Sequence, residues 1–117
     1  MASTVTALCP RFHRAIELIG RRWAGAIIRL LEGGRLRYAA LKGNIPQISD
    51  RMLSERLREL EAEGIVHRIV TPDTPVRVEY ELTKKGQDLH AALGAVARWA
   101  EEWIPPQAAK QAKKRSA

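Results

Sequence analysis

The sequence lacks what several classes of protein require. It has one cysteine in 117 residues, which excludes an intrachain disulfide and is typical of a reducing compartment, so we expect a cytoplasmic protein. It has no run of about 20 consecutive apolar residues, so we expect no membrane-spanning helix and no membrane partner. Its three histidines are scattered, and it has neither a glycine-rich phosphate loop nor a nucleophile-elbow motif. We therefore expect no enzyme, no metal and no other cofactor.

What the sequence has in excess is positive charge. Twenty Lys and Arg residues against 13 Asp and Glu residues give a net charge of +7 at pH 7. This charge favours an anionic partner, and nucleic acid is the first candidate. The excess is uneven, because Ser49–Leu82 has five basic and eight acidic residues, whereas the segments on both sides are basic.

The length allows one domain with a single core. We expect that domain over residues 9–104. Flexible tails are expected at 1–8 and at 105–117, because neither segment has an apolar period and the second is rich in Ala and Lys.

Hydrophobic periodicity predicts five helices and one hairpin. Apolar residues recur at helical spacing over 11–19, 23–32, 38–45, 49–63 and 83–104, whereas 66–71 and 76–82 have the character of strands. Ser49 and Thr83 are good N-caps for the last two helices, and Gly64 suits the end of the first of these. The intervening Pro72-Asp73-Thr74-Pro75 is typical of a turn. The predicted fold is mainly α with a small β-hairpin (α+β), a winged helix-turn-helix with a long C-terminal helix.

The predicted helix over 49–63 has an apolar face of leucines and an opposite polar face. In a helix-turn-helix this helix enters the major groove of DNA, where arginine can bind guanine and glutamate can accept from cytosine. The alternative is a solvated face on which arginines and glutamate pair within the helix. The candidate DNA-binding residues of this helix are Ser49, Arg51, Ser54, Glu55 and Arg58.

Phosphate contacts need positive charge, which the acidic middle segment does not supply in excess. We therefore assign these contacts mainly to Arg37, beside the short predicted helix, and to Arg77, close to the hairpin turn. Arg35 and Lys42 lie around the same short helix. For Lys42, ordinary surface solubility is the better explanation.

The last predicted helix has an apolar arc with two tryptophans. The whole helix is about 30 Å long. A hairpin and a small helix-turn-helix cannot easily cover an apolar arc along this length, so we expect a homodimer interface. The first helix could pack against it. The alternative is that the arc belongs to the core of the single chain, and some of it must. The candidate interface residues are Phe12, Ile16, Leu93, Val96, Trp99 and Trp103.

Seven short motifs resemble those of HxlR-type bacterial transcriptional regulators. They are Cys9-Pro10, Ile19-Gly20-x-x-Trp23, Ile27-Ile28-x-x-Leu31-x-x-Gly34, Arg37-Tyr38-x-x-Leu41, Ile45-Pro46-x-Ile48-Ser49-x-Arg51-Met52-Leu53, Leu57-Arg58-x-Leu60-x-x-x-Gly64 and Val78-Glu79-Tyr80-x-Leu82-Thr83-x-x-Gly86. The resemblance covers roughly Cys9 to Trp103. It implies a dimeric winged-helix repressor or activator that binds double-stranded DNA. The alternative is a winged helix that binds a protein and holds nucleic acid nonspecifically.

Cys9, the single cysteine, is the residue best suited to redox chemistry. It comes at the start of the first predicted helix, where a helix N-terminus stabilises a thiolate. Some HxlR-type regulators sense oxidants or electrophiles with a cysteine at the matching position, so the resemblance implies a small-molecule or electrophile effector. The alternative is an inert, partly buried side chain.

Overall fold

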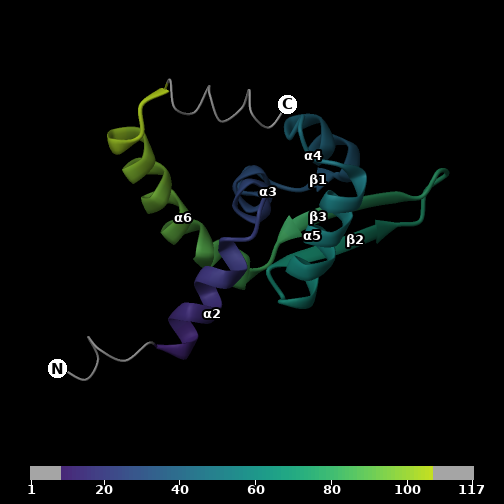
Figure 1. Cartoon of the computed structure of the whole chain (residues 1–117). Helices are drawn as coiled ribbons and strands as arrows, with labels where there is room; N and C mark the ends of the chain where they lie inside the picture. Colours follow the sequence, from purple (N-terminus) through teal and green to yellow (C-terminus); the bar gives the residue numbers. More distant parts are fainter. Residues whose placement is uncertain (1–8, 107–117) are drawn as a thin grey trace.

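The structure, a computed structural model, describes residues 9–106 (Figure 1). Its elements are α2 (Pro10–Ile19), α3 (Ala24–Leu31), β1 (Leu36–Arg37), α4 (Tyr38–Asn44), α5 (Asp50–Ala62), β2 (Val66–Thr71), β3 (Arg77–Leu82) and α6 (Lys84–Trp103). The five predicted helices and the predicted hairpin are all present, with bounds close to those expected. Residues 1–8 and 107–117, which make up most of the expected tails, lie outside the described range.

Local capping explains where α5 and α6 begin and end. The side chain of Ser49 accepts a hydrogen bond from the Met52 amide at 3.0 Å, and that of Thr83 accepts one from the Gly86 amide at 3.2 Å. Both residues are therefore the N-caps predicted from the sequence. After α5, Gly64 has a φ of +75°, a left-handed conformation that glycine adopts without a Cβ clash.

The hairpin belongs to a three-stranded antiparallel sheet with the order β1-β3-β2. The sequence did not predict β1, because two residues are too few to show a period. The paired residues Leu36 and Tyr80 join β1 to β3, which brings the start of α4 against the base of the hairpin. The expected alternation from Val76 onward is wrong at its first position, because β3 begins at Arg77 and Val76 is 60% exposed.

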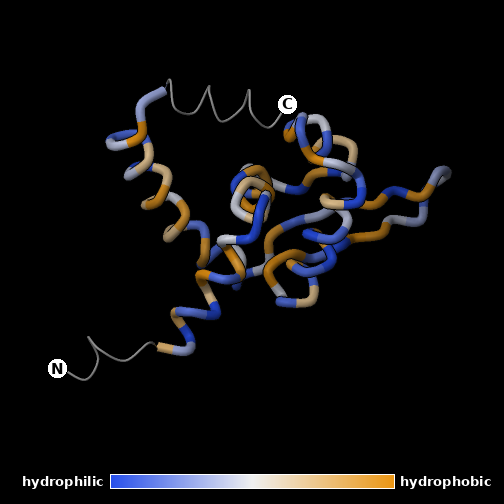
Figure 2. The backbone as a smooth tube through the Cα atoms, in the orientation of Figure 1, coloured by the Kyte–Doolittle hydropathy of each residue, from blue (hydrophilic) through white to orange (hydrophobic). Residues whose placement is uncertain are grey.

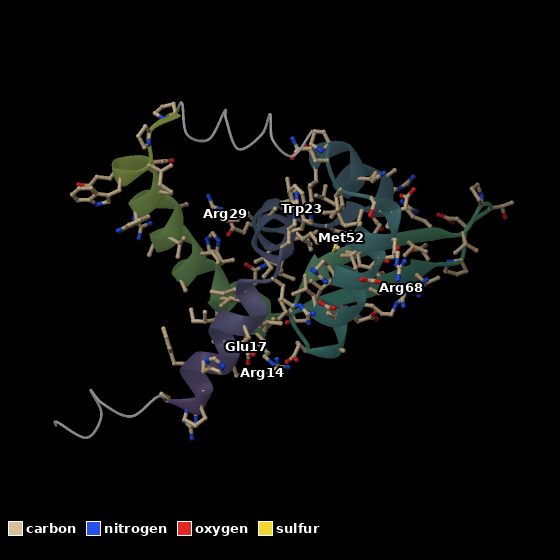
Figure 3. The ribbon with its side chains drawn as sticks, in the orientation of Figure 1. Arg14, Glu17, Trp23, Arg29, Met52 and Arg68 are labelled. Atoms are coloured by element: carbon tan, nitrogen blue, oxygen red, sulfur yellow. The ribbon has the colours of Figure 1, made fainter. Side chains whose placement is uncertain are left out.

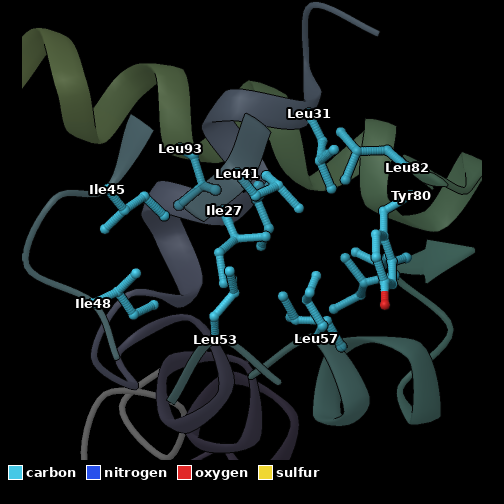
Figure 4. Packing of buried hydrophobic residues seen from close by; sticks show 14 residues of the cluster. Ile27, Leu31, Leu41, Ile45, Ile48, Leu53, Leu57, Tyr80, Leu82 and Leu93 are labelled. Carbon is cyan, nitrogen blue, oxygen red and sulfur yellow. The ribbon is translucent and has the colours of Figure 1, made fainter. Parts of the chain in front are cut away.

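The core lies where α3, α4 and α5 pack against the sheet (Figure 4). Its least exposed large side chains are Ile27, Ile28, Leu31, Leu41, Leu53, Leu60, Ile65 and Val66. Figure 1 shows α2 and α6 on the outside of this body, with the hairpin extending from the opposite side. With α4 and α5 as the helix-turn-helix and β2–β3 as the wing, the chain has a winged helix-turn-helix fold. Within the described residues, no helix is long and apolar enough to span a membrane.

Candidate functional site

The two faces of α5 are separated as the sequence predicts. Leu53, Leu57 and Leu60 are buried in the core, with at most 2% of each residue exposed. On the opposite side Arg58 is exposed, and the side chain of Arg51 is 90% exposed. The helix thus presents a polar face to solvent while its leucines anchor it to the body of the protein.

On this polar face Arg51 pairs with Glu55. The Nε atom of Arg51 lies 3.2 Å from Oε1 of Glu55, one helical turn away. An exposed pair at this spacing contributes only about 0.3–0.5 kcal/mol to stability. Both side chains can therefore exchange the pair for contacts with DNA at little cost. The pair is thus compatible with a face that contacts DNA and with a solvated face that only forms ion pairs within the helix.

A polar contact holds α4 against the beginning of α5. The Tyr38 hydroxyl lies 3.0 Å from the Asp50 carboxylate, to which it can donate, and 3.4 Å from the Ser54 hydroxyl. Lys42 also approaches Asp50, with 3.6 Å between Nζ and Oδ1. These contacts set the position of α5 relative to α4, and they engage Ser54, one of the predicted DNA-binding residues.

Arg37 and Arg77 lie together at the wing. Arg37 ends β1, is exposed, and lines a surface recess of about 440 Å³ with residues 73–78 of the hairpin turn. Arg77 lines the same recess and pairs with Asp73 at 2.6 Å between Nη2 and Oδ2. Its Nε atom is buried and has no hydrogen-bond partner among the described residues. The structure thus brings two predicted phosphate-binding residues to one edge of the molecule.

Arg35, by contrast, is committed to the sheet. Its guanidinium lies 4.0 Å from Glu79 and 3.3 Å from Glu81, both on β3. These pairs join the loop before β1 to β3, so Arg35 contributes to the sheet as well as to the surface charge.

Sequence reasoning missed Arg56, which is only 9% exposed. Its Nε donates to the Arg22 carbonyl at 2.8 Å, and its Nη1 donates to the Glu59 carboxylate at 3.2 Å. Arg21 also reaches Glu59, at 3.5 Å. This network joins α5 to the loop between α2 and α3. The helical spacing of Arg56 from Leu60 indicated a position near the apolar face.

The first helix carries Cys9 at its N-terminal end. Cys9 is the N-cap residue of α2 and is exposed, and its carbonyl accepts a hydrogen bond from the His13 amide at 3.0 Å. The His13 ring lies 3.7 Å from Glu17, one turn further along the helix. An ion pair between Arg14, labelled in Figure 3, and Glu63 joins α2 to the residue that ends α5.

Apolar side chains on α2 and on the second half of α6 are exposed in the single chain. Figure 2 shows hydrophobic segments recurring along both helices although they lie on the outside. Leu93 is an exception among the predicted interface residues, because it is 8% exposed and packs in the core. We therefore reassign Leu93 from the interface to the core of the single chain. The exposed residues, which we call the α2–α6 stripe, are Phe12, Ile16, Val96, Trp99, Trp103 and Ile104.

Among residues 9–106, no three His, Cys, Asp or Glu side chains are grouped so that they could hold a metal ion.

Comparison with known sequences identifies related regulators. The model of the HxlR-like helix-turn-helix family matches residues 18–108. The HTH-type transcriptional regulator YvaP of Bacillus subtilis is 48% identical over 99 residues, which cover 85% of this chain and 92% of YvaP. The HTH-type transcriptional regulator YodB of the same species is 44% identical over 99 residues, which cover 85% of this chain and 88% of YodB.

Solved structures agree with this comparison. Reduced YodB from B. subtilis matches with a TM-score of 0.76 and 44% identity, over 86% of this chain and 98% of the chain in that structure. The redox regulator HypR in its oxidised form matches with a TM-score of 0.78 and 36% identity, over 83% of this chain and 99% of HypR. The quinone-bound form of YodB matches with a TM-score of 0.72 and 41% identity, over 82% of this chain and 100% of that chain.

Proposed function

This chain belongs to the HxlR-like helix-turn-helix family of DNA-binding transcriptional regulators, and we propose that it binds an inverted-repeat operator as a homodimer. Each subunit places α5 in the major groove, with the β2–β3 wing beside it. The protein acts in the cytoplasm as a repressor or activator and performs no catalysis. The observation that carries this proposal is the exposed polar face of α5, held on the core by three buried leucines.

The shape and charge of the molecule support this placement. The major groove is about 12 Å wide and admits one helix. With α5 in the groove, Arg37 and Arg77 at the wing lie to one side, where they can meet phosphates of the backbone. The Tyr38 contact to Asp50 keeps α4 in place behind α5, so that the two helices approach DNA as one rigid unit.

Arg51→Ala is expected to relax base preference, because the Arg51 side chain is 90% exposed at the start of α5. Specific binding should weaken by about 1–3 kcal/mol, while binding to unrelated DNA changes little. Fluorescence anisotropy measures both affinities. It uses an operator duplex selected from random DNA and an unrelated duplex. Arg37→Ala is the matched comparison, and it should weaken both complexes similarly. An unchanged ratio of the two affinities in Arg51→Ala would show that α5 does not read bases.

The α2–α6 stripe supports the homodimer. It contains two tryptophans, the residue type most enriched in the energetic centres of protein interfaces. A two-fold axis would place the stripe of one subunit on the same stripe of the other, which covers both copies at once. An inverted-repeat operator then requires the two α5 helices to face the same side of the dimer, so that they meet successive turns of the major groove.

We further propose that Cys9 couples an electrophile or an oxidant to DNA binding. YodB has been solved with bound quinone, and HypR in an oxidised form, so both relatives provide a precedent. In this chain Cys9 is exposed at the end of α2, the helix that carries Phe12 and Ile16 of the stripe. The Arg14–Glu63 pair connects α2 to the end of α5. A group added at Cys9 would therefore act on the dimer surface and on the position of α5.

Cys9→Ser is expected to make DNA binding indifferent to electrophiles. In the wild type, benzoquinone should form a thioether through addition of the Cys9 thiolate to the ring, and affinity for the operator should change. The rate of alkylation of the native protein against pH, together with DNA binding before and after modification, provides the measurement. With one cysteine per chain, a disulfide must join two subunits or capture a small thiol. DNA binding that does not respond to modification in the wild type would make Cys9 an inert residue.

A further inference from the structure

Two arginines without ion-pair partners line one recess between α5 and the hairpin. The recess has a volume of about 220 Å³, and Arg58 of α5 and Arg68 of β2 both border it. Within residues 9–106, neither guanidinium forms an ion pair or a hydrogen bond, and both residues are exposed. The other residues that line the recess are Ser54, Leu57, Glu61 and Tyr80.

The sheet register explains why Arg68 lies beside α5. Arg68 on β2 is directly opposite Tyr80 on β3, and opposite residues of an antiparallel pair project from the same face of the sheet. Tyr80 is buried in the core beneath α5, so this face is the one that packs against the helices. Arg68 therefore projects toward α5, where Figure 3 shows it on the hairpin side of the helix.

We propose that this recess is the seat of one DNA backbone phosphate, held by Arg58 and Arg68 together. The inference rests on the proposed placement of α5 in the major groove, because a strand bordering that groove then passes between the helix and the wing. Two guanidiniums offer the forked donors that fit phosphate oxygens, and the Ser54 hydroxyl lines the same recess. At about 220 Å³ the recess is smaller than the 300–1,000 Å³ typical of sites for organic ligands, but it can hold a phosphate group.

This seat changes how the chain neutralises DNA. The segment 49–82 has an excess of acidic residues, but many of these pair with neighbouring arginines, whereas Arg58 and Arg68 stay free. Glu61 is the one carboxylate that lines the recess, so the recess has a net positive charge. Arg58 is thereby reassigned from base reading to phosphate binding, and Arg68 becomes a DNA contact that periodicity did not indicate.

Arg68→Ala is expected to lower affinity for the operator duplex and for an unrelated duplex by the same factor, about tenfold near 0.1 M salt for each DNA-bound subunit. The slope of log K against log salt should become shallower by about 0.9 for each DNA-bound subunit. Arg68→Lys keeps the charge and should keep most of the slope. Arg98→Ala is the matched control, because it removes one exposed positive charge from α6, and its slope should equal that of the wild type. Thermal melting checks that each variant is folded.

Glu61→Gln tests the seat in the opposite direction. Removal of the carboxylate from the recess should raise affinity for both duplexes, and this gain should shrink when Arg68 is also replaced by Ala. An unchanged slope in folded Arg68→Ala, or a loss confined to the operator, overturns the seat. The ratio of operator affinity to unrelated-duplex affinity in Arg51→Ala tests the placement of α5 in the groove separately. If Arg51→Ala lowers this ratio as expected but Arg68→Ala leaves DNA binding unchanged, the phosphate seat is rejected and the placement of α5 is kept.

Discussion

Trp99→Glu is expected to convert the protein from a dimer into a monomer and to abolish tight operator binding. Trp99 is 58% exposed in the single chain and lies within the α2–α6 stripe. In a two-fold interface the substitution buries a carboxylate without a partner in both subunits, at a cost of several kcal/mol. A monomer meets one half-site instead of two, so operator affinity should fall by about two orders of magnitude or more. Sedimentation velocity at micromolar concentration and anisotropy provide the two measurements.

Ala91→Glu is the control for this substitution. It adds the same carboxylate to α6 at an exposed position outside the stripe, so the variant should remain a dimer with wild-type operator affinity. Because Trp99 is exposed in the single chain, circular dichroism of Trp99→Glu should still show a folded, helical protein. A wild type that sediments as a monomer at micromolar concentration would contradict the homodimer and, with it, the inverted-repeat operator.

Gly86→Ala is expected to destabilise the protein more than any other glycine-to-alanine change in a helix. A Cβ atom at Gly86 would lie 2.4 Å from the Ile65 carbonyl oxygen and 3.0 Å from Cδ2 of Leu82. The Ile65 carbonyl cannot easily move away, because it accepts hydrogen bonds from the amide and the hydroxyl of Thr83. Overpacking of this severity should lower the free energy of unfolding by about 3 kcal/mol. The midpoint of thermal unfolding should then fall by roughly 10–20 °C.

Gly25→Ala is the matched control in α3. Apart from the adjoining residues of its own helix, no atom lies within 4 Å of a Cβ at Gly25, so the change adds only helix propensity and should stabilise the protein by about 0.5–1 kcal/mol. Calorimetry or circular dichroism melting compares the two variants directly. Equal melting temperatures for Gly86→Ala and the wild type would show that α6 does not pack as closely on Ile65 as the structure has it.

The sequence alone determined the order and type of the helices and of the hairpin strands, and the positions of the local caps. These features depend on local interactions, which a sequence displays directly. The caps at Ser49 and Thr83 need only the amide three residues further on, and Gly64 needs only its own φ. The buried face of α5 was also predictable, because helical spacing places its leucines on one side whatever packs against them.

Tertiary structure alone decided which neighbours each surface residue has. Two residues of β1 become a strand only because β3 is present to pair with them. Along one apolar arc, Leu93 is covered by the core whereas Trp99 is left exposed, a difference that periodicity cannot show.

The same reason separates the arginines of this chain. Arg56 is enclosed by the loop between α2 and α3, Arg35 is paired with β3, and Arg68 lies beside Arg58 because of the sheet register. In the sequence all four are basic residues with nothing to tell their partners apart. Their different surroundings depend on contacts between segments far apart in the chain, and only the folded arrangement brings those segments together.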